Sequence, residues 1–209
     1  MRLGVIGNLK GDLSALANAA RLLVDSGRVD RVLYLGKDDS LDRVVGSWAR
    51  EIVGANPSQE ALFARATRAC VNAKPDEITD FVESERARRR LRVFASVPLP
   101  PGRTIEILDG RIVVFVYDKG ALDEEDIGGA SVLVFGRAET RVVHRVGSRA
   151  FVSPGPVRPP ESAGLAILDD DSPGCIVVEF LSSDGSVEHV ERLEPKAGAG
   201  KMKVQGGGP

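Results

Sequence analysis

The sequence predicts an α/β chain that joins one βαβ unit to a β-rich second half. The chain begins with an apolar run, a glycine-rich turn and a stretch of helical periodicity, and a second apolar run follows at residues 32–35. More helical spacing extends to about residue 92, and from residue 104 onward short apolar runs alternate with turn signals. The second half supplies no further βαβ units, so a doubly wound sheet is not expected.

The opening segment, "MRLGVIGNLKGDLSAL", predicts a strand at residues 3–6, a turn at residues 7–11 and a helix that Asp12 caps. Apolar residues recur at helical spacing after Asp12, and Gly27 ends the helix. The strand at residues 32–35 then closes on a turn at Gly36 and Lys37. Strand, helix and strand at this spacing predict a parallel pair of strands.

Residues 41–92 are expected to be mostly helical, with Trp48 on the apolar face of the first helix. The next helix is expected to start at Pro57, capped by Asn56 with Gln59 as the capping partner. Pro75 starts a third helix, which ends in the arginine-rich run "ESERARRRLR". We interpret this run as a solvated helix face, because it lacks the interleaved aromatic residues of a polyanion-binding surface. Its apolar residues Ile78, Phe81 and Val82 are expected to be buried, and Leu62, Phe63, Phe81 and Val82 to cover part of the sheets.

The second half predicts hairpins and short buried strands. Asp109 and Gly110 form a strong two-residue turn between strands at 104–108 and 112–117. A short helical piece at 121–130, a strand in "SVLVFG", a hairpin around Gly147 and Ser148, and three further strands follow. We expect a single domain over residues 1–194, with the helical segment at about 56–92, and a flexible glycine-rich tail at 195–209.

Composition limits the function classes. The 209 residues carry a net charge of −2, so a broad nucleic-acid-binding face is not expected. No apolar run approaches the roughly 18 residues of a membrane span, and no signal-peptide pattern is present, so a cytoplasmic protein without a membrane partner is expected. Cys70 and Cys175 predict reduced thiols rather than a disulfide framework or a metal cluster.

Four landmarks occur in order along the chain: "LGVIGNLKGDLSAL", "DRVLYLGKDD", "DGRIVVFVYDKG" and "SVLVFGRAETRVVHRVGSRAFVSPGPVRPP". Together they resemble the calcineurin-like metallophosphoesterases, in particular their small prokaryotic phosphodiesterase branch. The resemblance covers about residues 1–190 except the helical region 56–90. It implies an αββα sandwich of two mixed β-sheets flanked by helices, with the site at the strand ends and with an extra helical segment in this chain.

The positions that carry metal ligands in this family hold other residues here. In the resemblance, the first aspartate and its partner histidine correspond to Asn8 and Lys10, and the bridging aspartate corresponds to Lys37. The histidine that ends the later strand corresponds to Val116 or Tyr117, and the Gly-His-x-His pair corresponds to Arg137 and Glu139. The Asn-His motif is missing near "VFASVP". The only two histidines, His144 and His189, are expected on the surface of hairpin strands.

A two-metal phosphoesterase needs clustered carboxylates and imidazoles. Ammonium and guanidinium groups repel divalent cations and offer no lone pair while protonated. We therefore expect no metal, no other cofactor and no catalytic residue at these positions. Two arrangements remain open. Lys10, Lys37 and Arg137 could bind an anion together with the amides of the turn at residues 7–11, or they could pair internally with Asp38, Asp118 and Glu139.

The sequence favours a non-catalytic relative of the metallophosphoesterases that acts as a binding or regulatory module, so we do not expect an enzyme. An unknown protein partner, a phosphate-bearing small molecule or an oligomer would each suit such a module. A weakly active or atypical phosphoesterase is one alternative. A nucleotide-binding α/β protein is another, because Gly4, Gly7 and Gly11 surround the first turn and Asp38 follows the second strand. Their spacing is not that of a dinucleotide or phosphate-loop motif.

Overall fold

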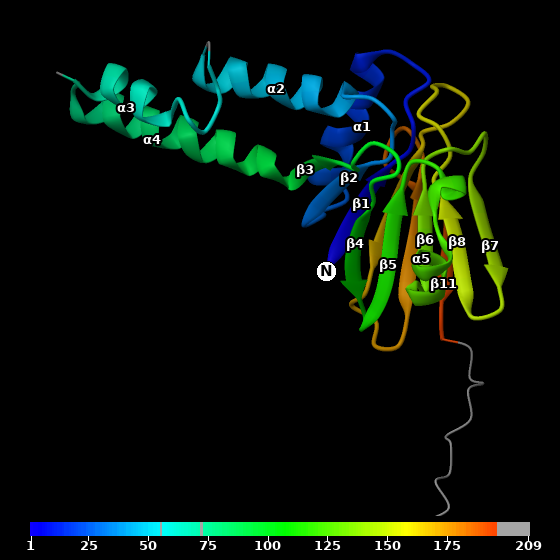
Figure 1. The fold of residues 1–209 in the computed structure, drawn as a ribbon. Coiled ribbons are helices and arrows are strands. Elements are labelled where there is room, and N and C mark those ends of the chain that lie inside the picture. Colours follow the sequence, from blue (N-terminus) through cyan, green and yellow to red (C-terminus); the bar gives the residue numbers. More distant parts are fainter. Residues whose placement is uncertain (55, 72, 196–209) are drawn as a thin grey trace, which may run out of the picture.

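The structure, a computed structural model, describes residues 1–54, 56–71 and 73–195. Two mixed β-sheets pack face to face with helices outside them (Figure 1), which confirms the α/β sandwich that the resemblance implies. The first sheet has the strand order β11-β10-β9-β1-β2-β3 and the second has the order β4-β5-β6-β8-β7. Within the described residues no helix is both long enough and apolar enough to cross a membrane.

The strands of the first sheet come from both ends of the chain. The parallel pairs β1–β2 and β2–β3 stand beside the antiparallel pairs β1–β9, β9–β10 and β10–β11. The strands are β1 (Arg2–Ile6), β2 (Arg31–Tyr34), β3 (Phe94–Ser96), β9 (Leu165–Asp169), β10 (Ile176–Leu181) and β11 (Val187–Leu193).

The second sheet is formed entirely by the β-rich half. The turn at Asp109 and Gly110 joins β4 to β5, with φ of 49° and 69°, as the two-residue hairpin signal predicts. The β5–β6 and β6–β8 pairs are parallel. The strands are β4 (Thr104–Leu108), β5 (Arg111–Val116), β6 (Val132–Phe135), β7 (Val142–Val146) and β8 (Arg149–Ser153).

The helices divide between the outer faces of the sandwich and a projection. The helix α1 begins after Asp12, whose carboxylate accepts a hydrogen bond from the Ala15 amide at 2.8 Å, so the predicted cap is confirmed. With α2 it covers the outer face of β1, β2 and β9. The helices are α1 (Leu13–Asp25), α2 (Ser40–Val53), α3 (Leu62–Cys70), α4 (Pro75–Arg90) and α5 (Glu124–Gly129), with short 3₁₀ helices η1 (Leu91–Val93) and η2 (Lys119–Ala121).

The core between the sheets draws on both halves of the sequence. Leu3 and Leu33 of the first unit pack in one cluster with Phe115, Val134 and Phe180. Each of these side chains is buried. The sheets are therefore held together by apolar burial, at roughly 25 cal/mol per Å² of apolar surface removed from water.

The helices α3 and α4 form an arm that projects from the sandwich beside α2 (Figure 1). The prediction that Leu62, Phe63, Phe81 and Val82 cover the sheets is therefore wrong. Phe63 is 83% exposed, and Ile78 and Val82 are 40% and 39% exposed, so the expected burial of Ile78 and Val82 is also wrong. Helical spacing identified an apolar face, but in this fold α4 packs against α2 and α3 instead of a sheet.

The predicted start of the second helix is also wrong. α3 begins at Leu62 and not at Pro57. The Asn56 carboxamide accepts a hydrogen bond from the Ser58 amide at 3.1 Å, which forms a local turn instead of a helix cap. The guanidinium of Arg65 donates to the carbonyls of Asn56 and Ser58, which fixes this turn ahead of the helix.

Candidate functional site

The turn at residues 7–11 follows β1 and is fixed by other parts of the chain. The amide of Gly7 donates to the carbonyl of Gly164 at 2.9 Å, and the amide of Lys10 donates to the carbonyl of Val157 at 2.9 Å. The amide of Leu9 donates to the hydroxyl of Tyr34 at 3.2 Å. Three of the amides that an anion could have used therefore already have acceptors.

Lys10 reaches from this turn to the second sheet. Its ammonium donates to both carboxylate oxygens of Glu139, at 2.7 and 2.6 Å. Glu139 lies after β6, so the pair joins the ends of β1 and β6 across the sandwich. The end of β6 carries a second pair, in which the guanidinium of Arg137 contacts the carboxylate of Asp118, just after β5.

The turn after β2 behaves differently. The carboxylate of Asp38 accepts hydrogen bonds from the Tyr34 hydroxyl at 3.0 Å and from the Ser40 amide at 3.1 Å. Lys37 is exposed, and within the described part of the chain it takes part in no ion pair. Internal pairing thus accounts for Lys10 and Arg137, whereas Lys37 remains available to solvent.

Close backbone packing joins these turns. A β-carbon added at Gly7 would lie 1.7 Å from the carbonyl oxygen of Gly155, and one added at Gly136 would lie 1.9 Å from the carbonyl oxygen of Leu35. Only glycine allows such close approach without a shift of the backbone. The turn after β6 therefore lies directly against the turn after β2, and the turn after β1 lies against the segment after β8.

The remaining predicted positions lie in less polar surroundings. Val116 is buried in a cluster with Phe135 on the outer face of the second sheet, so it offers no ligand atom. Tyr117 is partly exposed directly after β5. The side-chain oxygen of Asn8 is buried and has no hydrogen-bond partner among the described residues. His144 and His189 lie on β7 and β11, as expected, and His189 is 3.1 Å from Glu191.

The carboxylates of the site are all held in their ionised form. The hydrogen bond from Lys10 lowers the pKa of Glu139, and the Gly120 amide together with Arg137 lowers the pKa of Asp118. Burial acts to raise the pKa of Asp38, but hydrogen bonds from Ser40 and Tyr34 outweigh it and lower that pKa. A general base works best with a pKa near the operating pH, so none of the three suits that role at neutral pH.

These residues do not fit a two-metal centre. Glu139 and Asp118 could offer oxygen ligands, but their lone pairs accept hydrogen bonds from Lys10 and Arg137. A divalent cation would have to displace the Lys10 ammonium and the Arg137 guanidinium from these carboxylates. Among the described site residues, the side-chain oxygen of Asn8 is buried without a hydrogen-bond partner, and a single amide oxygen is a weak metal ligand.

Tyr34 is the site residue that sequence reasoning missed. It is fully buried, and its hydroxyl joins the turn after β1 to the turn after β2 by accepting from Leu9 and donating to Asp38. Burial raises the pKa of its hydroxyl, so the group stays protonated and keeps its donor proton. A tyrosine among the aliphatic residues of "RVLYLG" is the available signal, because a buried phenol needs a polar partner.

A cavity of about 390 Å³ lies beside Glu139 at this end of the molecule. Its lining includes Arg141, Arg158 and Glu188, and its apolar wall includes Phe180. Arg141 stacks over the Phe180 ring, 5.3 Å from the ring centroid, and lies 3.7 Å from Glu188. The lining therefore mixes both signs of charge with an aromatic surface.

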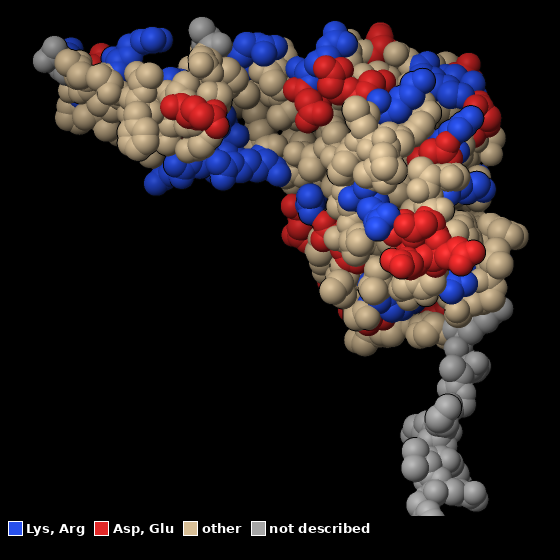
Figure 2. All heavy atoms as spheres, in the orientation of Figure 1, with Lys and Arg blue, Asp and Glu red and all other residues tan. Residues whose placement is uncertain are grey.

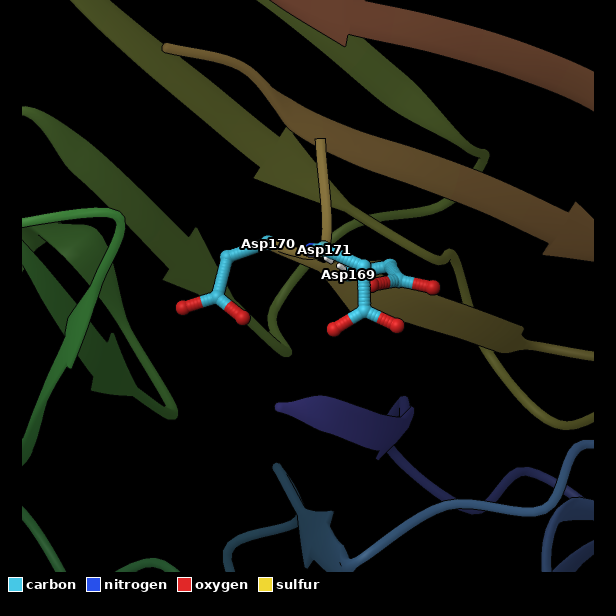
Figure 3. Close-up of side chains that lie close together, drawn as sticks. All are labelled: Asp169, Asp170 and Asp171. Carbon is cyan, nitrogen blue, oxygen red and sulfur yellow. Dashed lines mark hydrogen bonds between the residues drawn. The ribbon is translucent and has the colours of Figure 1, made fainter. Parts of the chain in front are cut away.

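Three consecutive carboxylates, Asp169, Asp170 and Asp171, lie close together at the end of β9 (Figure 3). Arg2 pairs with Asp169 in the β1–β9 register, so this cluster lies at the opposite end of β1 from the turn at residues 7–11. The α-amino group of Met1 lies 2.5 Å from Asp170 and 3.3 Å from Asp171, and Arg2 lies 3.4 Å from Asp169. Cations of the chain itself thus balance this cluster.

No protein-family model matches the chain, and no curated protein sequence matches it. Among solved structures, the chain is similar to a conserved uncharacterized protein from Streptococcus pneumoniae, which is a predicted phosphoesterase. The two share 14% identity with a TM-score of 0.48, and the match covers 93% of this chain and 98% of that chain. It is also similar to a single mutant of Vps29 from Entamoeba histolytica, with 15% identity, a TM-score of 0.47, and coverage of 93% and 99%. A novel archaeal phosphodiesterase is similar with 12% identity, a TM-score of 0.44, and coverage of 92% and 100%.

Proposed function

We propose that this chain is a non-catalytic binding or regulatory module built on a metallophosphoesterase-like sandwich. The observation that carries the proposal is the pairing of Lys10 with Glu139 and of Arg137 with Asp118. In each pair a cation at a mapped ligand position holds one of the carboxylates that could have bound a metal. Hydrolysis of a phosphate ester would need a metal-activated water or a general base, and these pairs leave none of the described site carboxylates suited to either role.

The binding role is supported by the cavity beside Glu139. A lining that joins Arg141 and Arg158 to Glu188 and Phe180 suits a small molecule or peptide end with both an anionic group and an apolar part. Glu139 lines the cavity and also pairs with Lys10, so an occupant of the cavity would directly contact this ion pair. Lys37, exposed at the same end of the molecule, is a further cation for an anionic group.

The test combines an activity assay with elemental analysis of the purified protein. We expect no hydrolysis of phosphomonoester or phosphodiester substrates above background, with Mn²⁺ added or withheld. We also expect less than about 0.1 metal ion per chain, because bound cations would compete with Lys10 and Arg137. About two metal ions per chain that are lost on Glu139→Gln, or Mn²⁺-dependent turnover, would contradict the proposal.

Thermal shift measurements test whether Lys10, Lys37 and Arg137 form an anion site or are accounted for by internal pairing. Inorganic phosphate, as a probe of a site formed by Lys10, Lys37 and Arg137, is expected to produce no saturable rise in melting temperature. A saturable rise that Lys37→Ala abolishes would instead favour an anion bound by Lys10, Lys37 and Arg137. Arg43→Ala is a matched control, because Arg43 is an exposed cation on α2 that is not a mapped position.

A further inference from the structure

The arm formed by α3 and α4 has a face that nothing in the described chain covers. On α4, Ile78, Val82, Arg86 and Arg90 follow one another every four residues and are all exposed. The opposite side of α4 packs inward, where Glu85 and Arg88 are buried. Residues spaced by four share one side of a helix, so the exposed residues form one continuous surface, the outer face of α4.

The charge of α4 reverses along its length. The first half carries the exposed acids Asp76, Glu77 and Asp80. The second half begins with the exposed acid Glu83 and then carries the exposed bases Arg86, Arg89 and Arg90. Within the described residues, the only α4 side chains in ion pairs are Glu85 and Arg88. Figure 2 shows blue side chains along the lower edge of the arm, where it borders the open angle between arm and sandwich.

We propose that α4 pairs with α4 of a second copy of this chain, antiparallel and about a two-fold axis. The midpoint of the helix Pro75–Arg90 falls between Val82 and Glu83. Full antiparallel overlap therefore sets Asp76 against Arg89 of the second copy, brings Glu83 within one turn of Arg86 of that copy, and places Val82 at the axis. A two-fold interface uses the same patch twice, and a helix with opposite charges on its two halves is complementary to itself.

The same charge reversal argues against a polyanion. A nucleic acid presents uniform negative charge, so the acidic half of α4 would repel it along the same surface that Arg86, Arg89 and Arg90 would bind. Exposed Ile78 and Val82 are also better suited to a partner helix, since apolar side chains gain by burial against one another. The proposal is independent of what the cavity beside Glu139 binds.

The test measures the self-association of the full chain by sedimentation over a wide range of concentration. The wild type is expected to show a monomer–dimer equilibrium that weakens as salt is raised. Arg86→Glu with Arg90→Glu replaces the two bases of the outer face by acids, and we expect the dissociation constant to rise at least tenfold. Asp76→Lys with Glu83→Lys replaces two of the exposed acids of α4 by bases and is expected to have the same effect.

Mixing the two charge variants provides the decisive comparison. Each variant alone is expected to be monomeric. The mixture is expected to form a one-to-one heterodimer, because helix surfaces of opposite charge then meet. Circular dichroism of each variant shows that the helices are intact. A wild type that stays monomeric at every concentration, or a mixture that does not associate, would overturn the proposal. So would a single-stranded oligonucleotide that binds the monomer through Arg86 and Arg90.

A cross-link locates the axis. In a Cys70→Ser background, Val82→Cys is expected to form an intermolecular disulfide under mild oxidation. Phe63→Cys is the control: Phe63 is highly exposed, but it lies two residues from buried Arg65 and thus on the opposite side of α3. Efficient cross-linking through Phe63→Cys and none through Val82→Cys would contradict the antiparallel α4 arrangement.

Discussion

At the scale of single residues, Tyr34 connects the two turns of the βαβ unit. Its ring belongs to the cluster under α1 and α2, while its hydroxyl contacts Leu9 and Asp38. The side chain of Tyr34 thus packs in the core through its ring and contacts both turns of the site through its hydroxyl. Loss of the hydroxyl would leave the Leu9 amide without an acceptor and would remove a donor from the Asp38 carboxylate.

Tyr34→Phe is expected to lower the free energy of unfolding by about 1–2 kcal/mol, because a partly buried amide and a carboxylate each lose a partner. The pKa of Asp38 is expected to rise, since the Tyr34 hydrogen bond lowers it in the wild type. Urea unfolding and NMR titration measure the two effects. Tyr117→Phe is the matched control and should change neither, because no hydrogen bond of the Tyr117 hydroxyl occurs among the described residues.

At the scale of elements, a buried ion triad holds the arm together. The carboxylate of Glu85 on α4 accepts from Arg65 on α3 at 2.7 Å and from Arg88 at 2.8 Å. Arg88 also donates to the side chain of Gln59 at 2.8 Å. All three charged side chains are buried. The packing of the arm therefore depends on the Glu85 carboxylate, whereas the packing of the sandwich depends on an apolar core.

Glu85→Gln is expected to destabilise the arm by about 3 kcal/mol, because two arginines stay buried without a counter-charge. Hydrogen exchange of α3 and α4 amides should accelerate, while exchange in β1 and β9 should not. Glu83→Gln, two residues earlier and exposed, is the control and should stay within about 0.5 kcal/mol. Equal acceleration in the strands would show that the arm does not open separately.

The same triad predicts a dependence on pH. Burial acts to raise the pKa of Glu85, but the hydrogen bonds from Arg65 and Arg88 outweigh it, so the pKa of the folded state is lowered. A lowered pKa gives stability that is fully present above the ordinary glutamate pKa of about 4.3 and is lost as pH falls through the folded value. Arm exchange should therefore accelerate in acid in the wild type, and Glu85→Gln should remove this dependence.

At the scale of the whole molecule, the core between the sheets joins the two halves of the sequence. Phe115 of the second sheet is fully buried, in the same cluster as Leu3 and Leu33 of the first. Trp48 on α2 packs against Phe94, with ring centroids 5.5 Å apart, and so reports on the first sheet. A mutation at Phe115 and the fluorescence of Trp48 together allow the cooperativity of unfolding of the sandwich to be measured.

Phe115→Ala is expected to cost about 3–4 kcal/mol, from lost burial and the cavity that remains. The unfolding transitions seen by Trp48 fluorescence and by circular dichroism should shift together, because both sheets share one core. Ile107→Ala, on β4 and 67% exposed, is the control and should have little effect. A Trp48 transition that does not move would mean that the two halves unfold separately.

The sequence by itself determined the elements whose signals are local. These elements are the Asp12 cap, the turn at Asp109 and Gly110, and the succession of strands along the chain after residue 104. They follow from short-range hydrogen bonding and side-chain periodicity, and the structure confirms them. The αββα architecture came from a resemblance in four motifs. The same motifs predicted which positions face the strand ends, but not what these positions contact.

Only the tertiary structure decided which charges pair and which apolar faces are covered. Lys10 pairs with Glu139, 129 residues away, and not with the nearer Asp38, because the sheets bring the ends of β1 and β6 together while Tyr34 and Ser40 occupy Asp38. Similarly, helical spacing gives Ile78 and Val82 an apolar face but cannot name the surface that covers it. Pairing and burial depend on distances in space, which local patterns do not encode.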